Sequence, residues 1–432
     1  MAGESWLDIP AESGFSLDNI PFGIISHAGS KQPHAAVAIG SHVLDLKLFS
    51  DGGGFSGLPE AAPKILQSFS ETTLNFAELG RPLHNKVREY LGLVLALDTP
   101  FARLLRDNAS LRSASLVPLS HVETHLPLKV GDYTDFYVGK NHAYNVGVLF
   151  RGSDNALQPN YSHLPVGYHG RASSIIVSGT PLRRPWGQIL DASKAPIHQP
   201  SRRLDIELEL GAFVCRSNAL GSPVPITEAE KYIFGYVLLN DWSARDIQAW
   251  EYVPLGPFNA KNFASTISAW VVLADALEPF RTEGIKNDHK VLPYLQNPTT
   301  RGVFDINLEV SLNTETSSEP SVLTRSNGKY LLWSFPQMVV HHTAGGCPLN
   351  PGDLIGSGTI SGPDSGTQGS LLEITSGGSK PVILSGGESR TFLADGDEVV
   401  FRGWCERPGI GRVGFGECRG RILAPWPSGY SV

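Results

Sequence analysis

The sequence predicts a mainly β protein with α+β elements, in which a small N-terminal domain precedes a large C-terminal domain. The composition of 46 glycines, 31 prolines and only 18% charged residues favours turn-rich β structure over helical bundles. The length of 432 residues suggests two or three domains of roughly 150 residues each. Helical patterns stop near residues 121–128, so we expect one domain at 1–125 and the other at 126–432.

The N-terminal domain is predicted to contain two strand segments followed by a helix. Residues 22–27 and 35–46 have the composition of strands, and a turn at Gly40-Ser41 interrupts the second segment. Apolar residues recur at helical spacing over 81–97. This segment therefore predicts a small α+β domain.

The C-terminal domain is predicted to consist of short strands separated by glycine and proline. Examples are 172–177 and 371–374, whereas the polar stretch 313–326 is predicted to be a loop. An apolar strand that begins at Tyr236 ends at Asp241 and turns into a helix, with Ser243 as the expected N-cap.

Charge and cysteine usage exclude several classes of protein. The net charge is −7, from 35 basic and 42 acidic residues without a block of like charge, which argues against nucleic acid or an anionic membrane as the main partner. The four cysteines lack C-x-x-C spacing, so neither a zinc cage nor a disulfide framework is indicated. The start lacks a signal-peptide pattern, and no stretch of 18 apolar residues occurs, so a cytoplasmic protein is expected.

One familiar motif is present without its required context. Residues 409–414 match G-x-G-x-x-G, but no helix pattern follows and too little chain remains for a βαβ unit. A dinucleotide site is therefore rejected. The sequence also lacks G-x-S-x-G, H-E-x-x-H and P-loop motifs, so serine hydrolase, zincin and NTPase activities are not indicated.

The most informative feature is the pair Glu207 and Glu209 in an otherwise apolar run. Strand alternation would point both carboxylates to the same face. Like charges side by side are destabilising, so the pair suggests a hard divalent cation between them. The alternative is a half-exposed strand whose polar face lies in water.

Further chemistry-bearing residues cluster in the second domain. Asp135, Tyr137 and His142 lie within one short segment, a mixture that suits a base working beside a metal. In the helix that follows Asp241, three hydrogen-bonding residues share one face at i, i+3 and i+7; they are Arg245, Gln248 and Tyr252. The alternative for Asp241 is a carboxylate that only caps this helix.

Two glycine-rich stretches complete the candidate site. Lys261 is a single lysine among small and turn-forming residues, where its ammonium group could face a developing anion, although a plain surface lysine is the alternative. Thr359 lies in the glycine-rich run 356–362, where backbone can approach a ligand closely.

Together these motifs resemble the fumarylacetoacetate hydrolase family. The resemblance is carried by residues 132–137, 151–152, 163–174, 240–248 and 358–363. It implies a homodimer with an N-terminal SH3-like barrel and a C-terminal β-roll. It also implies hydrolysis of the C–C bond of 4-fumarylacetoacetate to fumarate and acetoacetate, the last step of tyrosine and phenylalanine catabolism.

The resemblance also implies roles for individual residues. Calcium would be held by Asp135, Glu207, Glu209 and Asp241, and a magnesium ion would lie near Asp241, Lys261 and Ser265, where the family pattern has threonine at the last position. His142 would accept a proton, Glu373 would orient it, and Arg245 and Lys261 would polarise the substrate. Substrate contacts would come from Tyr137, Arg151, Gln248, Tyr252 and Thr359.

The expected chemistry agrees with these roles. Cleaving a C–C bond with water requires an activated water, a polarised carbonyl and stabilisation of a departing enolate, which a histidine and a metal site can supply. Two alternatives stay open: another small dicarbonyl substrate, and a calcium-stabilised β-rich binding protein without activity. Both calcium and magnesium prefer oxygen ligands, so the sequence does not decide between them at the main site.

Overall fold

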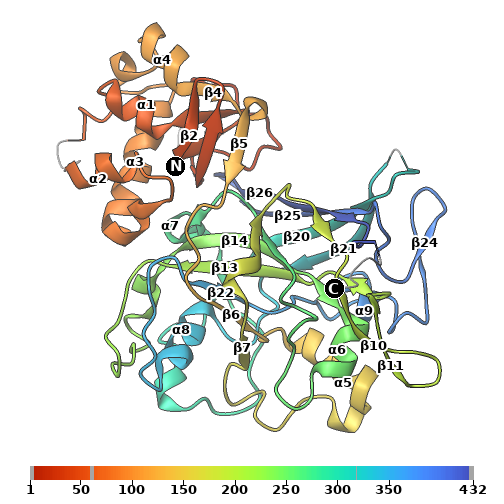
Figure 1. The fold of residues 1–432 in the computed structure, drawn as a ribbon. Coiled ribbons are helices and arrows are strands. Elements are labelled where there is room, and N and C mark those ends of the chain that lie inside the picture. Colours follow the sequence, from red (N-terminus) through yellow and green to blue (C-terminus); the bar gives the residue numbers. More distant parts are fainter. Residues whose placement is uncertain (1–3, 59–62, 318, 428–432) are drawn as a thin grey trace.

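The computed structural model describes residues 4–58, 63–317 and 319–427 (Figure 1). Its N-terminal part is a five-stranded antiparallel sheet in the order β4-β3-β2-β1-β5, so β4 and β5 form the edges. The strands are β1 Phe22–His27, β2 Ser30–Ile39, β3 His42–Asp45, β4 Leu116–Pro118 and β5 Val122–His125. Its helices are α1 Leu46–Asp51, α2 Pro63–Ser68, α3 Arg81–Leu95 and α4 Ala109–Ser115.

The two strand segments and the helix predicted for the N-terminal domain are confirmed with small changes. The first predicted strand is β1, and the second is split into β2 and β3 at Gly40, whose φ of 55° is one that glycine adopts readily. Helix α3 ends at Leu95, two residues before the predicted end at Leu97. Its apolar side chains pack on one face of the sheet.

The C-terminal part contains two larger sheets. The central sheet has eight strands in the order β7-β6-β22-β13-β14-β16-β8, with β17 paired to β14. Its strands are β6 Tyr133–Phe136, β7 Gly167–His169, β8 Ile175–Val177, β13 Leu208–Val214, β14 Ile233–Asp241, β16 Ser265–Ile267, β17 Val272–Leu273 and β22 Leu354–Gly356. The second sheet has the order β21-β20-β25-β26-β9, formed by β9 Leu182–Arg183, β20 Asn307–Asn313, β21 Ser321–Asn327, β25 Glu398–Arg407 and β26 Ile410–Leu423.

Smaller elements surround these sheets. Two-stranded pairs are β10 Trp186–Leu190 with β11 Pro196–Pro200, β12 Leu204–Asp205 with β15 Ser243–Ala244, β18 Arg281–Thr282 with β19 Val303–Phe304, and β23 Val382–Ile383 with β24 Ser389–Arg390. The helices are α5 Lys140–Arg151, α6 Arg245–Glu251, α7 Ala274–Leu277, α8 Phe335–Thr343 and α9 Leu371–Ile374. Figure 1 shows α5 and α6 close together at the end of the molecule away from the N-terminal sheet.

Both faces of the central sheet are buried, each in a different core. In β14, Tyr236 and Leu238 join the large C-terminal core, whereas Val237 and Leu239 join the core of the N-terminal part. This alternation is the period of two that strand geometry imposes. The N-terminal part therefore packs directly on the central sheet, and the second sheet lies against the opposite face.

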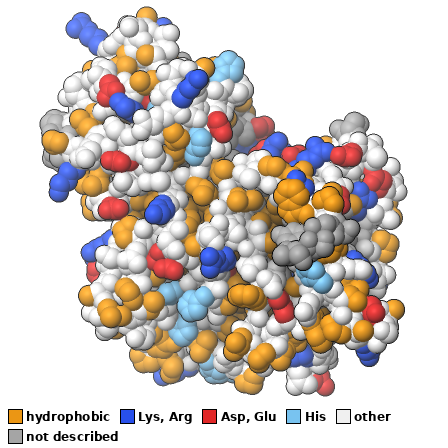
Figure 2. All heavy atoms as spheres, viewed as in Figure 1, with side chains coloured by type: hydrophobic (Ala, Val, Ile, Leu, Met, Phe, Trp, Pro, Cys, Tyr) orange, Lys and Arg blue, Asp and Glu red, His pale blue; other side chains and the backbone are white. Residues whose placement is uncertain are grey.

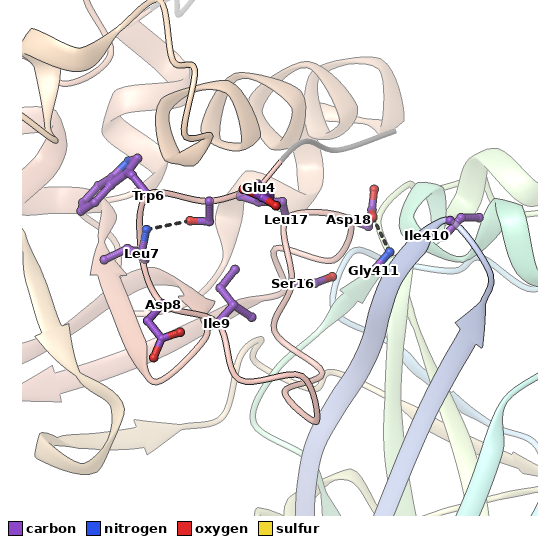
Figure 3. Close-up of a pocket in the computed structure, with 12 residues that line it drawn as sticks. Glu4, Trp6, Leu7, Asp8, Ile9, Ser16, Leu17, Asp18, Ile410 and Gly411 are labelled. Atoms are coloured by element: carbon purple, nitrogen blue, oxygen red, sulfur yellow. Dashed lines mark hydrogen bonds between the residues drawn. The ribbon is translucent and has the colours of Figure 1, made fainter.

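The glycine motif at 409–414 serves this packing. It forms the turn between β25 and β26 and the start of β26. A strand therefore follows the motif, whereas a dinucleotide-binding motif is followed by a helix. Gly414 lies so close to Gly14 that a Cβ on either would approach the other's Cα within 2.7 Å or less. Asn19 donates to the carbonyl oxygens of both glycines. Beside this junction, an open cavity of about 740 Å³ separates the N-terminal segment from the turn, and the Gly411 amide donates to Asp18 (Figure 3).

Four local expectations were wrong in whole or in part. The segment at 371–374 is helix α9 and not a strand, because the Ser370 hydroxyl accepts from the Glu373 amide and starts a helical turn. Ser243 is not an N-cap: it lies in β15, and Ala244 precedes α6. The predicted loop at 313–326 includes the first residues of β21, and the predicted strand at 172–177 begins only at Ile175.

The distribution of charge on the surface and the lengths of the helices agree with the absence of charged blocks and of long apolar stretches in the sequence. Basic and acidic side chains are interspersed over the face shown in Figure 2. Within the described ranges, every helix is too short or too polar to cross a membrane.

Candidate active site

Four buried carboxylates meet on one face of the central sheet. Asp135 comes from β6, Glu207 precedes β13, Glu209 lies in β13 and Asp241 ends β14. One oxygen of each lies within 4.8 Å of the others, and none of the four residues is more than 6% exposed. Alternation thus brings Glu207 and Glu209 together as predicted, and the alternative of a half-exposed polar face is wrong.

A glycine in the intervening strand permits this approach. Strand β22 lies between β6 and β13, and its Gly356 pairs with Asp135 on one side and with Gly211 on the other. A Cβ at Gly356 would lie 2.5 Å from Asp135 Oδ1 and 3.2 Å from Glu209 Oε2. Any larger residue would therefore push the two carboxylates apart. The glycine-rich run noted in the sequence contributes by leaving this space.

The cluster has unused oxygen ligands of the kind that a divalent cation prefers. Within the described residues, no donor reaches Asp135 Oδ1 or Glu209 Oε1, although both atoms are buried. Burial, followed by the charge of Asp241, raises the pKa of Asp135 well above its ordinary value, and burial with Asp135 does the same for Glu209. Uncompensated buried carboxylates are costly, so the donor set fits a hard cation.

Two cations contact the cluster from outside the sheet. Lys261 Nζ lies 2.5 Å from Glu207 Oε2 and 2.7 Å from Asp241 Oδ2. Arg245 Nη1 lies 2.7 Å from Glu207 Oε1. Burial alone would raise the pKa of Glu207, but Lys261 and Arg245 outweigh it and hold this pKa well below its ordinary value. Glu207 is therefore an ionised carboxylate even without a bound ion.

A histidine and a glutamate form a second buried group. His142 Nδ1, in α5, lies 2.6 Å from Glu373 Oε2, in α9. Glu373 also accepts from Asn145, Ser361 and Ser370. Burial would raise the pKa of Glu373, but His142 and these donors lower it, so Glu373 is a carboxylate. Since a carboxylate only accepts, the neutral ring of His142 carries its proton on Nδ1, which leaves the lone pair on Nε2.

Both groups border one cavity of about 390 Å³. Nine of the predicted site residues line it; they are Asp135, Tyr137, His142, Arg151, Glu207, Arg245, Gln248, Tyr252 and Lys261. Apolar side chains, including Val146, Phe150 and Leu255, form much of the remaining wall. The cavity thus presents cations, a base and carboxylates to a small ligand whose remaining surface can be apolar.

The other predicted site residues lie behind this wall. Glu209, Asp241, Thr359 and Glu373 are buried and contact or flank residues that line the cavity, and Ser265 is buried behind Asp241. Ser265 Oγ donates to Asp241 Oδ1 at 2.7 Å. Thr359 Oγ1 is buried and has no partner among the described residues.

Two functional candidates were missed in the sequence. Tyr168 lines the cavity, and its hydroxyl donates to Asp241 Oδ2 at 2.9 Å. Asp205 contacts Arg245 from behind. Tyr168 lies inside one of the stretches that carry the resemblance, and Asp205 lies two residues before Glu207, but nothing in their spacing distinguishes them from neighbouring polar residues.

A second group with metal-ligand chemistry lies in the N-terminal sheet but satisfies itself. Asp45 Oδ2 lies 3.0 Å from His27 Nε2 and 2.5 Å from His34 Nε2, and Asp45 Oδ1 accepts from the Leu48 amide. The remaining nitrogen of each ring faces backbone, at Gly29 and Gln32. Since each polar atom of the three side chains already has a partner, this group requires no ion.

The fold and this cavity define a β-rich enzyme with a candidate divalent-cation site beside a histidine base. Sequence comparison gives the particular family. Residues 133–423 match the family described as "Fumarylacetoacetate (FAA) hydrolase C-terminal", and residues 18–127 match "Fumarylacetoacetase N-terminal". The chain therefore belongs to the fumarylacetoacetate hydrolase family.

Individual relatives match over nearly their whole lengths. The chain is 60% identical over 426 residues to fumarylacetoacetase of Aspergillus fumigatus, covering 97% of this chain and 98% of that relative. It is 47% identical over 423 residues to fumarylacetoacetase of Homo sapiens, with the same coverage of each chain. A solved fumarylacetoacetate hydrolase from Exiguobacterium antarcticum shares the fold, with a TM-score of 0.50, 16% identity and coverage of 94% of this chain and 99% of that one.

Proposed function

We propose that this protein hydrolyses the C–C bond of 4-fumarylacetoacetate to fumarate and acetoacetate, as the last step of tyrosine and phenylalanine catabolism. Support comes from relatives of that name at 60% and 47% identity over 97% of the chain. The structural observation that carries the proposal is that the His142–Glu373 pair and the acidic cluster border the same cavity.

The acidic cluster would hold the catalytic ion. Its ligands would be Asp135, Glu207, Glu209 and Asp241. We propose calcium because it accepts many oxygen ligands in irregular geometry, whereas magnesium requires a near-octahedral arrangement and keeps several waters. A second ion, magnesium, would lie near Asp241, Lys261 and Ser265. When bound, a divalent ion in the main site would polarise a carbonyl and stabilise an enolate.

His142 would act on water. With Nδ1–H donated to Glu373, its Nε2 can accept a proton from a water molecule as the oxygen adds to the carbonyl carbon. The C–C bond then breaks, its electron pair leaves with the acetoacetate carbon, and the proton held on Nε2 is delivered to that carbon. Water is thus divided between the two products, and no covalent enzyme intermediate is needed.

The remaining wall would bind and polarise the substrate. Arg245 and Lys261 place positive charge beside the cavity, where a developing oxyanion would be stabilised. Tyr137, Arg151, Gln248, Tyr252 and Thr359 would contact the substrate, whose two terminal carboxylates call for donors of this kind.

Finer features of the family are proposals as well. We propose an N-terminal SH3-like barrel at 1–125, a C-terminal β-roll at 126–432, a homodimeric assembly and a cytoplasmic location. Support for the assembly and location comes only from the family membership of the chain.

The direct test is the loss of ultraviolet absorbance of purified fumarylacetoacetate on mixing with the enzyme. We expect rapid loss, no loss after dialysis against EDTA, and recovery when calcium or magnesium is added back. An acylpyruvate should be cleaved far more slowly. Faster cleavage of the acylpyruvate would refute the substrate assignment, and full activity after EDTA would refute the role of the ion.

A further inference from the structure

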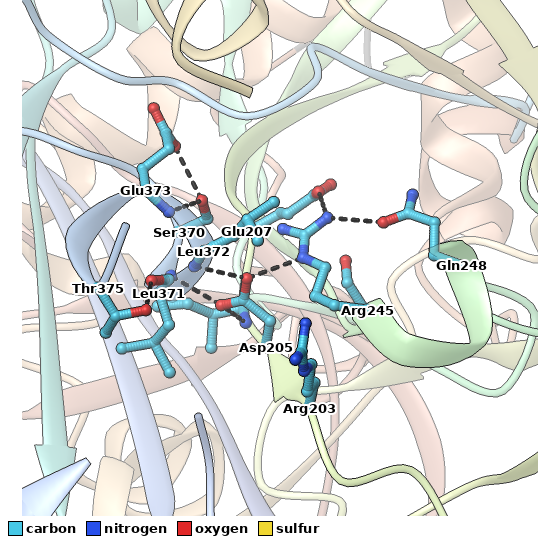
Figure 4. Close-up of polar contacts among 12 residues, drawn as sticks. Arg203, Asp205, Glu207, Arg245, Gln248, Ser370, Leu371, Leu372, Glu373 and Thr375 are labelled. Atoms are coloured by element: carbon cyan, nitrogen blue, oxygen red, sulfur yellow. Dashed lines mark hydrogen bonds and ion pairs between the residues drawn. The ribbon is translucent and has the colours of Figure 1, made fainter. Parts of the chain in front are cut away.

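Asp205 is a buried carboxylate that links two parts of the candidate active site. It ends the short strand β12, and its side chain is inaccessible to solvent. Figure 4 shows it between Arg245 and the start of helix α9. Its two oxygens accept from Arg245 Nε at 2.8 Å, from the amides of Leu371 and Leu372 at 2.7 and 2.9 Å, and from the Ile206 amide at 2.7 Å.

On one side, Asp205 determines which donors of Arg245 remain available. The Nε–H is used by Asp205, and Nη1 is used by Gln248 at 3.0 Å and by Glu207. Nη2 is buried and has no acceptor within the described residues. Because Arg245 lines the cavity, Asp205 helps to fix the orientation of the guanidinium group at its wall.

On the other side, Asp205 fixes the helix that carries Glu373. Helix α9 has only four residues, so it has little stability of its own. Asp205 accepts from two amides of its first turn, and Ser370 accepts from a third. These bonds hold the amides that a helix start would otherwise leave unpaired. The position of Glu373, and through it the ring of His142, therefore depends on Asp205.

We infer that Asp205 is a positioning residue for hydrolysis, which holds Arg245 and the Glu373–His142 pair in register across the cavity. The inference rests on the proposed function. Asp205 does not line the cavity, so it acts through its partners and does not touch the substrate. The Coulombic attraction to Arg245 and the four hydrogen bonds are all lost or weakened when the carboxylate becomes an amide.

The test compares Asp205→Asn with a matched control, Asp397→Asn. Asp397 is also buried, pairs with an arginine through Arg390 and accepts from the backbone amide of Ala394, but it is absent from the cavity wall. Both variants should lose thermal stability. Only Asp205→Asn should lose activity, with kcat for fumarylacetoacetate lower by about 10- to 100-fold and KM changed less, as for other residues that orient catalytic groups.

A double-mutant cycle separates positioning from general loss of structure. If Asp205 acts through Arg245, Arg245→Lys should cost much less in the Asp205→Asn background than in the wild type. In the Asp397→Asn background, Arg245→Lys should keep its full effect. Should Asp205→Asn fail to fold, Asp205→Glu keeps the charge but misplaces it, and the same kinetic loss is expected.

The outcomes distinguish this inference from the proposed function. Suppose that the wild type cleaves fumarylacetoacetate. Equal kcat values for Asp205→Asn and Asp397→Asn would then overturn the inference and leave the function standing. Additive effects of Asp205→Asn and Arg245→Lys on kcat would do the same. A wild-type protein that does not cleave fumarylacetoacetate would overturn both.

Discussion

Replacing Glu209 by glutamine should stabilise the ion-free protein and reduce the stability that a divalent cation adds. Glu209 is completely buried, its Oε2 accepts from the Gly358 amide at 3.0 Å, and its Oε1 has no donor among the described residues. Burial and the neighbouring Asp135 raise the pKa of Glu209 well above its ordinary value. The ionised side chain is therefore costly unless an ion is bound.

The direction with pH follows from this raised pKa. Glu209 has a higher pKa in the folded state than in the unfolded state, so the folded protein binds the proton more tightly. The contribution of Glu209 to the stability of the ion-free protein is therefore fully present below the unfolded-state pKa. It is lost as pH rises through the folded-state pKa. At pH 8 the ion-free folded protein bears the cost of this buried carboxyl group, and Glu209→Gln removes that cost, so the variant should be the more stable ion-free protein.

Binding of the ion should favour the wild type over the variant. Calcium at 100 times its Kd stabilises the wild type by about 2.7 kcal/mol, whereas a variant with a Kd about 100-fold higher gains only about 0.4 kcal/mol at the same concentration. Adding calcium should therefore shift the stability difference toward the wild type by about 2.3 kcal/mol.

The assay is thermal unfolding at pH 8 in EDTA and in calcium, repeated with magnesium. In EDTA the variant should melt above the wild type, and calcium should raise the melting temperature of the wild type by a few degrees more than that of the variant. Glu309→Gln is the control, because Glu309 lies in a strand and pairs with Arg325 away from the cavity. If Glu209→Gln is the less stable protein in both buffers, or EDTA leaves the wild type unchanged, the cluster is not a cation site.

Two further predictions concern histidines. His142→Asn should lower kcat by about 100-fold or more, since a general base contributes that much, while calcium titration by calorimetry stays unchanged; near-normal turnover would show that His142 is not the base. His84 is buried, and this burial lowers its pKa from 6.5 to about 4. Because the unfolded chain binds this proton more readily than the folded protein does, stability falls as pH is lowered from 6.5 through 4. The free energy of unfolding that is lost over this range is roughly 3 kcal/mol. His84→Gln should remove this pH dependence from urea unfolding, and an unchanged slope between pH 6.5 and 4 would contradict the assignment.

The local part of the site could be predicted from the sequence because short-range geometry determines it. A two-residue spacing at the start of β13 put Glu207 and Glu209 in one cluster, and helical spacing in and just after α6 put Arg245, Gln248 and Tyr252 along one wall of the cavity. These relations depend on short-range backbone geometry. The glutamate pair could therefore be proposed from its own spacing, whereas Asp135 and Asp241 entered the ligand set only through the family resemblance.

The pairing between distant strands could not be predicted in the same way. Asp135 reaches Glu209 only because β6 pairs in parallel with β22 and β22 pairs with β13, and no sequence period encodes that register. Helix α9 was mistaken for a strand because a short apolar run is compatible with both. The capping hydroxyl of Ser370 was the missed signal.

Charge balance explains why the cluster, Lys261 and Arg245 occur together. The four carboxylates carry −4; a divalent ion would offset two of these charges and Lys261 a third, while Arg245 is shared between Glu207 and Asp205. Without Lys261 and Arg245, one divalent ion would leave two buried negative charges uncompensated, which a low-dielectric interior does not tolerate. The same two cations border the cavity, so the groups that stabilise the ion site are also those that face an anionic substrate. Stability of the cluster and attraction of the substrate therefore depend on one arrangement of charge, and neither cation can be replaced without affecting both.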